Sequence, residues 1–397
     1  MQSPASLSSR EAAALLGVKP QTLYAYASRG LVRRVGSGKQ RRYLTEDLER
    51  LRQRAGARSG HAPVAAAALT FGEPVLDTRI TSIDERGPSY RGLLATELAR
   101  RGVPFEAVAE HLWAGALPAK PPLWPSLEGA RSTEPATLED LLLALPALAR
   151  AAPDRHLLTT EAELSLARRV IRSLAELVGG RSRPARGASI AALVAARGRG
   201  VERRHAVAAV DQALVLLADH ELNASSFAAR IAASTGANLL SCLQAALATL
   251  SGPRHGGACD RVEALLTEAD ALSEPRDVID ARSRRGEAVP GFGHPLYRQG
   301  DPRARALLER VALLGKRSAS LRQRAQAPLA LERAMSRQGL PATVDFGLVA
   351  LTRVLGMPKG SAALLFALGR SAGWVAQVLE QRGSEAVLRP RARYLGA

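Results

Sequence analysis

Apolar residues recur every three or four positions along most of the chain, the spacing that puts them on one face of a helix. From about residue 67 onward this pattern predicts an all-α fold, without the alternation of strands and helices that a nucleotide-binding sheet requires. The predicted helices span residues 93–102, 105–113, 138–150, 161–178, 203–219, 224–250, 260–272, 303–315 and 361–382. Thr160 to Glu163 reads as a capping box, and Asp301 with Pro302 as an N-cap followed by proline at the first helical position.

Residues 1–54 contain a separate small helical unit. A capping box from Ser8 to Glu11 predicts one short helix, and Pro20 predicts the start of a second that runs to Ser28. Two short helices joined at a glycine-containing turn are typical of a helix-turn-helix. The basic segment from Val32 to Tyr43 predicts a hairpin wing. The small residues, glycine and proline of 55–66 predict a linker.

Composition narrows the protein class. The 397 residues are 46% hydrophobic, enough for two or three domains with a sizeable core. No stretch approaches about 18 uncharged apolar residues, so no membrane span is expected, and Met1 to Ser9 show no signal peptide. Cys242 and Cys259 are too few for a disulfide scaffold, and without a CxxC pair no metal site is expected. We therefore expect a soluble, cytoplasmic protein.

The net charge of +18 is unevenly distributed. Residues 1–60 carry 12 basic and 4 acidic side chains, whereas the other 337 residues carry 43 and 33. A concentrated basic segment favours contact with nucleic acid or another anionic surface. Codon bias toward arginine explains the excess of that residue but not its clustering.

The N-terminal unit resembles the DNA-binding domain of the MerR and excisionase type over about 45 residues. The resemblance rests on Leu16-Gly17-Val18, Thr22-Leu23, Gly30-Leu31 and Arg42-Tyr43. It implies that the second helix enters the major groove of DNA and that the wing contacts phosphates. The implied DNA-binding residues are Lys19, Gln21 and Thr22, facing bases, and Tyr26, Arg33, Arg34, Arg41 and Arg42, on the backbone. The leucines at 15, 16, 23, 31 and 48 are expected in its core.

Chemistry-bearing residues gather between 219 and 391. Three histidines lie in acidic or glycine-rich settings, namely His220 in DHE, His255 in GPRHGGA and His294 in PGFGH. Asp345, Arg370 and Arg389 follow. Arginines bind carboxylates, imidazoles donate to carbonyl oxygens, and a carboxylate can remove a proton next to a carbonyl. This inventory suits carbon–carbon bond formation on a dianionic keto acid, although any single histidine is equally compatible with a core role.

In their order, these motifs resemble the citrate synthase family from about residue 70 to the end. They are DHELNAS (219–225), SGPRHGGA (251–258), PGFGHPLYRQGDPRA (290–304), TVDFG (343–347), ALGRSAGW (367–374) and RPR (389–391). The resemblance implies a mostly helical, two-domain fold. Its large domain comprises 67–253 with 340–397, and its small domain comprises 254–339.

The resemblance also implies a role for each matching residue. His255 hydrogen-bonds the acetyl thioester oxygen, Asp345 removes a proton from the acetyl methyl group, and His294 polarises the ketone of oxaloacetate. The residues implied to bind oxaloacetate are His220, Arg303, Arg370 and, from the other subunit of a homodimer, Arg389. The residues implied to contact coenzyme A are Arg298, Val289, Pro290 and Gly291. No bound cofactor is expected, because acetyl-CoA is a co-substrate.

The motifs depart from the commoner family pattern at Leu217, Cys259, Pro295 and Gln377, and Pro295 could shift the His294 loop. A Cys259–His255 nucleophile pair lacks a third orienting group, so packing is the favoured role of Cys259. The favoured function is synthesis of citrate by an enzyme fused to a DNA-binding module. Three alternatives stay open: 2-methylcitrate synthesis from propionyl-CoA, a non-catalytic metabolite-sensing transcriptional regulator, and a weakly active paralogue. Asp345 argues against a pure sensor, which needs the arginines but no base.

Overall fold

The computed structural model describes residues 6–16, 18, 20–28, 32–35, 42–45, 47–48, 76–127, 136–180, 187–294, 296–297, 299–384 and 386–389. The chain divides into two compact units, which we call the N-terminal unit (Met1–Asp77 with Arg389–Ala397) and the main unit (Thr78–Leu388). The predicted linker, 55–66, lies outside the described residues. The predicted boundaries of the domains stay predictions.

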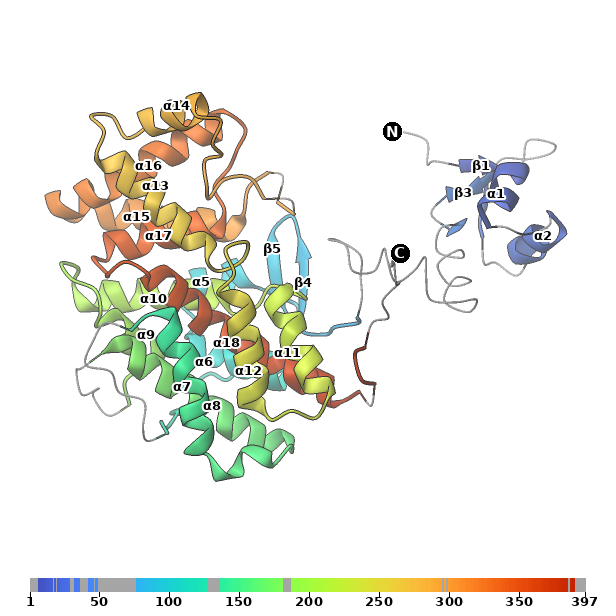
Figure 1. Ribbon diagram of the computed structural model, residues 1–397, viewed down its shortest axis with the longest axis horizontal. Helices are drawn as coiled ribbons and strands as arrows, with labels where there is room; N and C mark the ends of the chain where they lie inside the picture. The colour runs from blue at the N-terminus through green and yellow to red at the C-terminus, as the bar shows by residue number, and fades with distance from the viewer. Residues whose placement is uncertain are drawn as a thin grey trace, which may run out of the picture. The chain divides into compact units, whose positions relative to one another are not determined.

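The N-terminal unit combines two short helices with a three-stranded sheet (Figure 1). Its elements are β1 (Ser6–Ser8), α1 (Ser9–Leu16), α2 (Pro20–Ser28), β2 (Arg34–Val35) and β3 (Arg42–Leu44). The strands pair antiparallel in the order β1-β3-β2. The predicted capping box is confirmed, because Ser8 N donates to Glu11 Oε2 at 2.8 Å and Glu11 N donates to Ser8 Oγ at 3.3 Å.

A small apolar core holds this unit together. It consists of Ala12, Ala13, Leu23, Val32, Tyr43 and Leu48. Of the leucines expected there, Leu23 and Leu48 are buried, while Leu15 and Leu16 are only partly buried against the core. The fifth, Leu31, lies outside the described residues.

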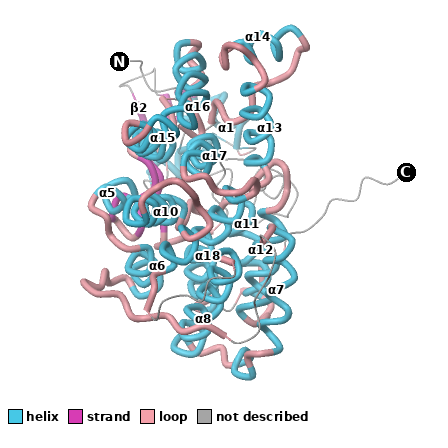
Figure 2. Tube along the Cα trace, turned by 90° about the vertical axis from the view of Figure 1, so that its left-hand side faces the viewer, coloured by secondary structure: helices cyan, strands magenta, loops and turns pink. Residues whose placement is uncertain are grey.

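The main unit is mostly helical, as predicted, with one small antiparallel sheet of β4 (Thr81–Asp84), β5 (Gly87–Tyr90) and β6 (Leu93–Leu94). Its helices are α5 (Ala95–Arg100), α6 (Phe105–Ala114), α7 (Leu138–Arg150), the 3-10 helix η1 (Pro153–His156), α8 (Thr160–Gly179), α9 (Ile190–Ala195), α10 (Arg203–Leu217), α11 (Ala224–Ser234), α12 (Leu239–Leu250), α13 (Ala258–Asp270), α14 (Asp277–Arg284), α15 (Pro302–Gly315), α16 (Ala319–Arg337), α17 (Val344–Val354) and α18 (Ser361–Arg382). Helices α13 to α16 gather at one end of the unit, opposite α6 to α8, in both views (Figures 1 and 2).

The structure corrects two sequence predictions. The single helix predicted at 224–250 is two helices, because Gly236 adopts a positive φ of 80° and Asn238 caps α12 by accepting from Ser241 N at 3.1 Å. The capping box predicted at Thr160 to Glu163 is also wrong. Thr159 caps α8, and the Glu163 carboxylate instead accepts a hydrogen bond from Arg382 at 2.9 Å.

Helix α18 forms the centre of the main unit. It packs against α6, α8, α10, α11, α12 and α17. In the part of the chain that the structure describes, it is the one helix long and apolar enough to span a bilayer, but 94% of its apolar window is buried inside the protein. Its apolar composition is therefore explained by its place in the core.

Candidate active site

Six of the predicted site residues come from six different segments of the main unit. They are His220 after α10, His255 before α13, His294 in the loop before α15, Arg303 on α15, Asp345 on α17 and Arg370 on α18. Burial lowers the pKa of His220 well below its usual value, and Arg303, Arg370, His294 and His255 lower it further, which places these four side chains near His220. The ring centres of His220 and His294 are 6.2 Å apart. Asp345 joins the set through Arg303, whose positive charge acts on its carboxylate.

Arg370 is a fully buried cation. Its Nε donates to the backbone oxygen of Leu217 at 2.9 Å, and its guanidinium carbon lies 4.9 Å from the centre of the Phe366 ring. Burial lowers the pKa of Arg370 to about 10, so the side chain still carries its charge at neutral pH. The contact uses the backbone of Leu217, so the departure from the family pattern at that side chain leaves it intact.

Arg303 is held by Asp301, the N-cap of α15. Its Nε and Nη2 donate to Asp301 Oδ1 and Oδ2 at 3.0 and 2.8 Å, and the carboxylate also accepts from Arg303 N at 3.0 Å. The predicted N-cap and first-turn proline are thereby confirmed. Burial opposes ionisation of Asp301, but Arg303 more than offsets it and lowers the pKa of the carboxyl group. The bidentate pair fixes the guanidinium plane and leaves Nη1 for a ligand.

His255 is anchored through one ring nitrogen. Its Nε2 lies 2.9 Å from Ser225 Oγ and 3.2 Å from Asn223 Oδ1, the oxygen that caps α11. Trp374 Nε1 donates to Ser225 Oγ at 3.1 Å. Burial, reinforced by Arg370, lowers the pKa of His255 to about 4, so the ring is neutral at pH 7. The Ser225 hydroxyl has one proton, which it can donate either to Asn223 Oδ1, 2.7 Å away, or to His255 Nε2. In the second arrangement the His255 ring carries its proton on Nδ1 and can donate it to a ligand.

His294 is also a neutral donor. The backbone N–H of Leu296 donates to His294 Nδ1 at 3.1 Å, which leaves the ring proton on Nε2. Burial lowers the pKa of His294, with Asp301 acting against the change. Its ring lies 6.2 Å from the ring of His220. The arrangement suits a hydrogen-bond donor to a carbonyl oxygen.

Asp345 lies in the first turn of α17 as a poorly solvated carboxylate. Burial raises its pKa, and the positive charge of Arg303 works in the opposite direction. Its oxygens accept two long hydrogen bonds, from Cys259 Sγ at 3.7 Å and from Thr343 Oγ1 at 3.4 Å. A carboxylate with such weak partners is a stronger base than an exposed one.

The segment predicted to contact coenzyme A is tied to the same site. Gly291 has a positive φ of 87°, and a side chain there would meet Val262 at 2.8 Å and Phe346 at 3.0 Å. Its oxygen accepts from Thr343 N at 2.9 Å, two residues before Asp345. Val289 and Pro290 are partly buried beside it, and Arg298 lies outside the described residues, as does Pro295.

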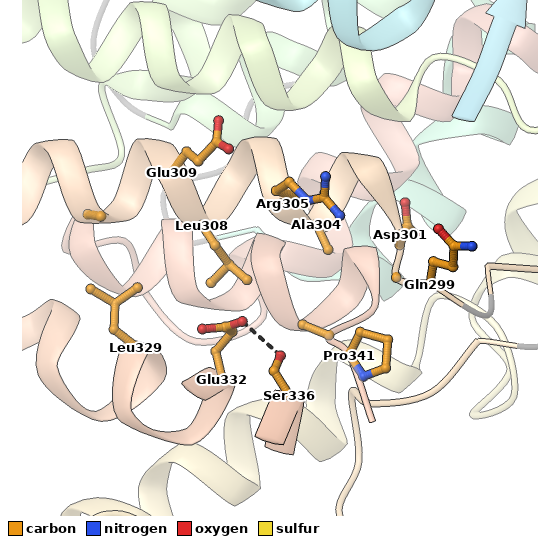
Figure 3. A pocket seen from close by; sticks show the side chains of 13 residues that line it. Gln299, Asp301, Ala304, Arg305, Leu308, Glu309, Leu329, Glu332, Ser336 and Pro341 are labelled. Atoms are coloured by element: carbon orange, nitrogen blue, oxygen red, sulfur yellow. Dashed lines mark hydrogen bonds between the residues drawn. The ribbon is translucent and has the colours of Figure 1, made fainter. Parts of the chain in front are cut away.

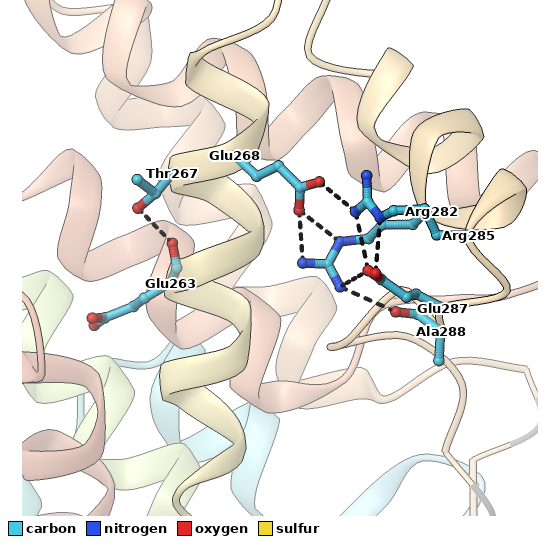
Figure 4. A network of polar contacts seen from close by, with 7 residues as sticks. All are labelled: Glu263, Thr267, Glu268, Arg282, Arg285, Glu287 and Ala288. Atoms are coloured by element: carbon cyan, nitrogen blue, oxygen red, sulfur yellow. Dashed lines mark hydrogen bonds and ion pairs between the residues drawn. The ribbon is translucent and has the colours of Figure 1, made fainter.

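A polar network braces the chain just before this segment (Figure 4). Glu268 on α13 accepts from Arg282 and Arg285 at 2.8 and 2.7 Å. Arg285 also donates to Glu287 at 2.8 Å, and Arg282 donates to the backbone oxygen of Ala288 at 3.4 Å. The network therefore connects α13 and α14 to the residue preceding Val289.

A surface pocket of about 340 Å³ opens elsewhere, between α15 and α16 (Figure 3). Leu308 and Leu329 line it together with Glu332, which accepts from Ser336 at 2.9 Å. It includes Asp301, but none of the six gathered residues is part of its lining. The pocket therefore adjoins the site through Asp301 but does not contain the residues predicted to carry the chemistry.

Arg389 and the predicted DNA-binding residues do not belong to the main unit that holds the six gathered residues. Arg389 is exposed and falls outside the main unit, although the preceding Leu388 N donates to Ser234 Oγ at 3.1 Å. In the N-terminal unit, Gln21 is exposed, Thr22 is partly buried and Tyr26 packs against the core.

The predicted DNA-contacting arginines have intramolecular partners where they are described. Arg33 forms a bidentate pair with Asp47, at 2.8 and 2.9 Å, and Arg42 donates to Ser6 Oγ at 3.0 Å. The side chain of Arg34, together with Lys19 and Arg41, lies outside the described part. Their contacts with DNA stay predictions.

The sequence reasoning missed several residues of the site. Asn223 and Ser225, which orient His255, belong to the DHELNAS motif, so the motif itself was the available signal. Trp374, expected only to pack the core, is buried and also donates to Ser225. Tyr297 lies in the motif PGFGHPLYRQGDPRA, so that motif was its available signal, whereas the contact between Cys259 and Asp345 had none.

Known proteins resemble both parts of the chain. Residues 70–391 match the family model of the citrate synthase C-terminal domain, and residues 6–56 match a helix-turn-helix domain. Citrate synthase 2 of Bacillus subtilis is 37% identical over 190 residues, which are 48% of this chain and 51% of that protein. A 2-methylcitrate synthase of Mycobacterium tuberculosis is 30% identical over 339 residues, 78% of this chain and 84% of the relative.

Comparison with solved structures also finds citrate synthases. The crystal structure of citrate synthase from Thermotoga maritima superposes with a TM-score of 0.64 at 26% identity, covering 82% of this chain and 94% of that one. The matches to several curated relatives, the Bacillus protein among them, span about half of those relatives' length. The chain belongs to the citrate synthase family and carries a helix-turn-helix domain over residues 6–56.

Proposed function

We propose that the main unit condenses a short acyl-CoA with oxaloacetate and releases a tricarboxylic acid and coenzyme A. The observation that carries the proposal is the meeting of a poorly solvated carboxylate, Asp345, with two neutral histidines, His255 and His294, beside buried arginines. A carbon acid needs a base and an oxygen-directed donor at the same time, and this set provides both.

In the proposed first step, Asp345 removes a proton from the acyl carbon next to the thioester carbonyl while His255 donates a hydrogen bond to the thioester oxygen. The resulting enol attacks the ketone carbon of oxaloacetate, and His294 Nε2 donates to the ketone oxygen. One well-placed donor of this kind contributes about 3–4 kcal/mol to such reactions. Water then cleaves the thioester, giving the carboxylate product and free coenzyme A.

Charge complementarity supports the choice of a dicarboxylate. In the described part of the chain no acid is hydrogen-bonded to Arg370 or to Nη1 of Arg303, so both can take a ligand's carboxylates, and His220 adds a neutral donor. We place Arg389 of the partner subunit in the same site of a homodimer. Acetyl-CoA is a co-substrate in this scheme, held by Arg298 and the Val289 to Gly291 backbone, and no bound cofactor takes part.

Acetyl-CoA is our first choice of acyl donor and propionyl-CoA the second. Relatives named as citrate synthase and as 2-methylcitrate synthase both resemble this chain. One methylene changes binding in an apolar pocket by only about 1–3 kcal/mol, so a small difference in pocket shape decides the preference.

The test is release of coenzyme A by the purified full chain, followed with a thiol reagent. Each acyl-CoA is supplied with oxaloacetate to the wild type, to Asp345→Ala and to a control, Asp280→Ala, whose carboxylate is exposed on α14. We expect turnover in the wild type and the control and a loss of at least about a thousandfold in Asp345→Ala. A folded wild type that binds oxaloacetate but turns over neither acyl-CoA would contradict catalysis and favour a metabolite-sensing regulator.

We further propose that the N-terminal unit binds DNA, because a helix-turn-helix match coincides with the most basic part of the chain. The measurement is fluorescence anisotropy with random-sequence duplex DNA at several salt concentrations. We expect affinity to fall steeply with salt and to weaken in Arg42→Ala, with Arg284→Ala on the exposed surface of the main unit as the control. Affinity that is equal in all three proteins, or independent of salt, would contradict this role.

A further inference from the structure

Tyr297 is buried among the residues proposed to bind oxaloacetate, although the sequence predicted no role for it. It is 3% exposed, and its hydroxyl lies 2.8 Å from His220 Nε2. Its ring centre lies 5.1 Å from that of His294 and 5.6 Å from the guanidinium carbon of Arg303. One phenol therefore contacts three of the proposed ligand-binding side chains.

The hydrogen bond to His220 has a defined direction. Burial raises the pKa of Tyr297 to about 12, so its hydroxyl carries a proton at neutral pH, and His220 is neutral. Among the described residues, His220 Nε2 is the single partner of this hydroxyl. A buried phenol with one partner satisfies its proton only by donating it, so Nε2 accepts. The proton of the His220 ring then lies on Nδ1, for which the described part of the chain provides no acceptor.

The phenol ring also completes the support of Arg303. Asp301 binds the guanidinium along the edge formed by Nε and Nη2, and the guanidinium carbon lies over the ring of Tyr297, 5.6 Å from its centre. The bidentate carboxylate fixes the guanidinium in its plane, and the cation–π contact with the ring adds a second restraint on its position. The free Nη1 is thereby held in one direction.

We propose that Tyr297 is a positioning residue for the dicarboxylate: its hydroxyl fixes the tautomer of His220 so that Nδ1–H faces the ligand, and its ring orients Arg303. The inference rests on the proposed function, since it concerns the same ligand. His220 belongs to the predicted large domain and Tyr297 to the predicted small domain. Their hydrogen bond therefore assembles the ligand-binding groups of both domains before the ligand arrives.

The test is Tyr297→Phe, which keeps the ring and removes only the hydroxyl. Binding of oxaloacetate and of acetyl-CoA is measured by calorimetry on the full chain, together with KM for each. Loss of a buried hydrogen bond is worth about a tenfold change in affinity. We expect oxaloacetate to bind about tenfold more weakly and acetyl-CoA to bind unchanged. Tyr43→Phe removes the hydroxyl of another buried tyrosine, in the N-terminal unit, and should change neither constant.

Unchanged or tighter oxaloacetate binding by Tyr297→Phe would overturn the inference. A second measurement separates it from the proposed function: nitrogen NMR of the histidine rings, with His220 assigned through His220→Asn. In the ligand-free wild type, Nε2 of His220 should resonate as an unprotonated acceptor, and this signal should shift in Tyr297→Phe. If the wild type binds no oxaloacetate but the Nε2 signal of His220 still shifts in Tyr297→Phe, the proposed ligand is refuted and the hydrogen bond between Tyr297 and His220 is supported. An Nε2 that is protonated, or that the substitution leaves unchanged, would refute the inference itself.

Discussion

Asp345 is a base whose two hydrogen-bond donors, the hydroxyl of Thr343 and the thiol of Cys259, are both distant. The thiol of Cys259 lies 3.7 Å from Oδ1, and burial, together with the nearby charge of Asp345, raises the pKa of that thiol, so it stays protonated. A thiol stabilises a carboxylate less than a hydroxyl or an amide does. The Cys259 thiol therefore stabilises the ionised form of Asp345 only weakly.

This contact predicts a shift in the pH profile. Cys259→Ser supplies a stronger donor, which stabilises the ionised form of Asp345 and lowers its pKa. Because the reaction needs the carboxylate, the acid limb of kcat/KM should move to lower pH by about half a unit to one unit. Cys259→Ala removes the donor and should move the limb upward. The measurement is kcat/KM between pH 5 and 9.

The matched control is Cys242→Ala, because that thiol is also buried but donates weakly to the backbone oxygen of Ala237. It should leave the profile in place. If Cys259→Ser and Cys259→Ala shifted the acid limb in the same direction, the change would reflect packing rather than hydrogen bonding to Asp345.

At the scale of elements, the sequence predicted long helices well and their interruptions poorly. The predicted bounds of α7 and α18 are those observed, because each has a continuous apolar stripe and a clear start. The α11–α12 break was missed although Gly236 and Asn238 mark it, because the apolar periodicity on its two sides was joined into one helix. Helices α16 and α17 were not predicted, although they have 19 and 11 residues. The short α9 and α14 carry too few turns for a periodic signal.

The network on α13 and α14 makes a prediction about coenzyme A. Glu268→Gln removes the charge that holds Arg282 and Arg285 and so loosens the chain before Val289. Partly exposed ion pairs contribute about 0.2–1 kcal/mol each, so KM for acetyl-CoA should rise about two- to fivefold. KM for oxaloacetate should stay unchanged, because its proposed ligands lie on other elements.

Steady-state kinetics with each substrate varied in turn gives both constants. Thr267→Ala, on the same helix, removes a hydroxyl that bonds only to the backbone oxygen of Glu263 in the described part of the chain, and should change neither. An equal rise in both KM values for Glu268→Gln would indicate a general disturbance of this end of the molecule instead of an effect on the coenzyme segment.

For the whole molecule, the site depends on segments that the sequence separates by 150 residues. His220, His255, His294, Arg303, Asp345 and Arg370 could be predicted because each stands in a motif of a known family. The side chains that contact these residues could not be predicted, because Tyr297 and His220 are 77 positions apart in the sequence and Cys259 and Asp345 are 86 apart. No local pattern encodes such pairs, since they arise only when the helices pack.

The last prediction concerns Arg389, which lies outside the unit that holds the other site residues. If it acts in the site of the partner subunit, two inactive variants should complement each other. In a heterodimer of Asp345→Ala and Arg389→Ala, one site then carries both lesions and the other carries none. If Arg389 acts within its own chain, every site carries one lesion and the mixture stays inactive.

Co-expression of the two variants with different affinity tags isolates the heterodimer. Its coenzyme A release should reach about half of the wild-type rate, since one of its two sites is intact. The pair Arg303→Ala and Asp345→Ala is the control, because both residues lie within the main unit of one chain and each site then keeps one lesion. An inactive heterodimer of the first pair would place Arg389 outside the partner's site, and a monomeric wild type would exclude a shared site altogether.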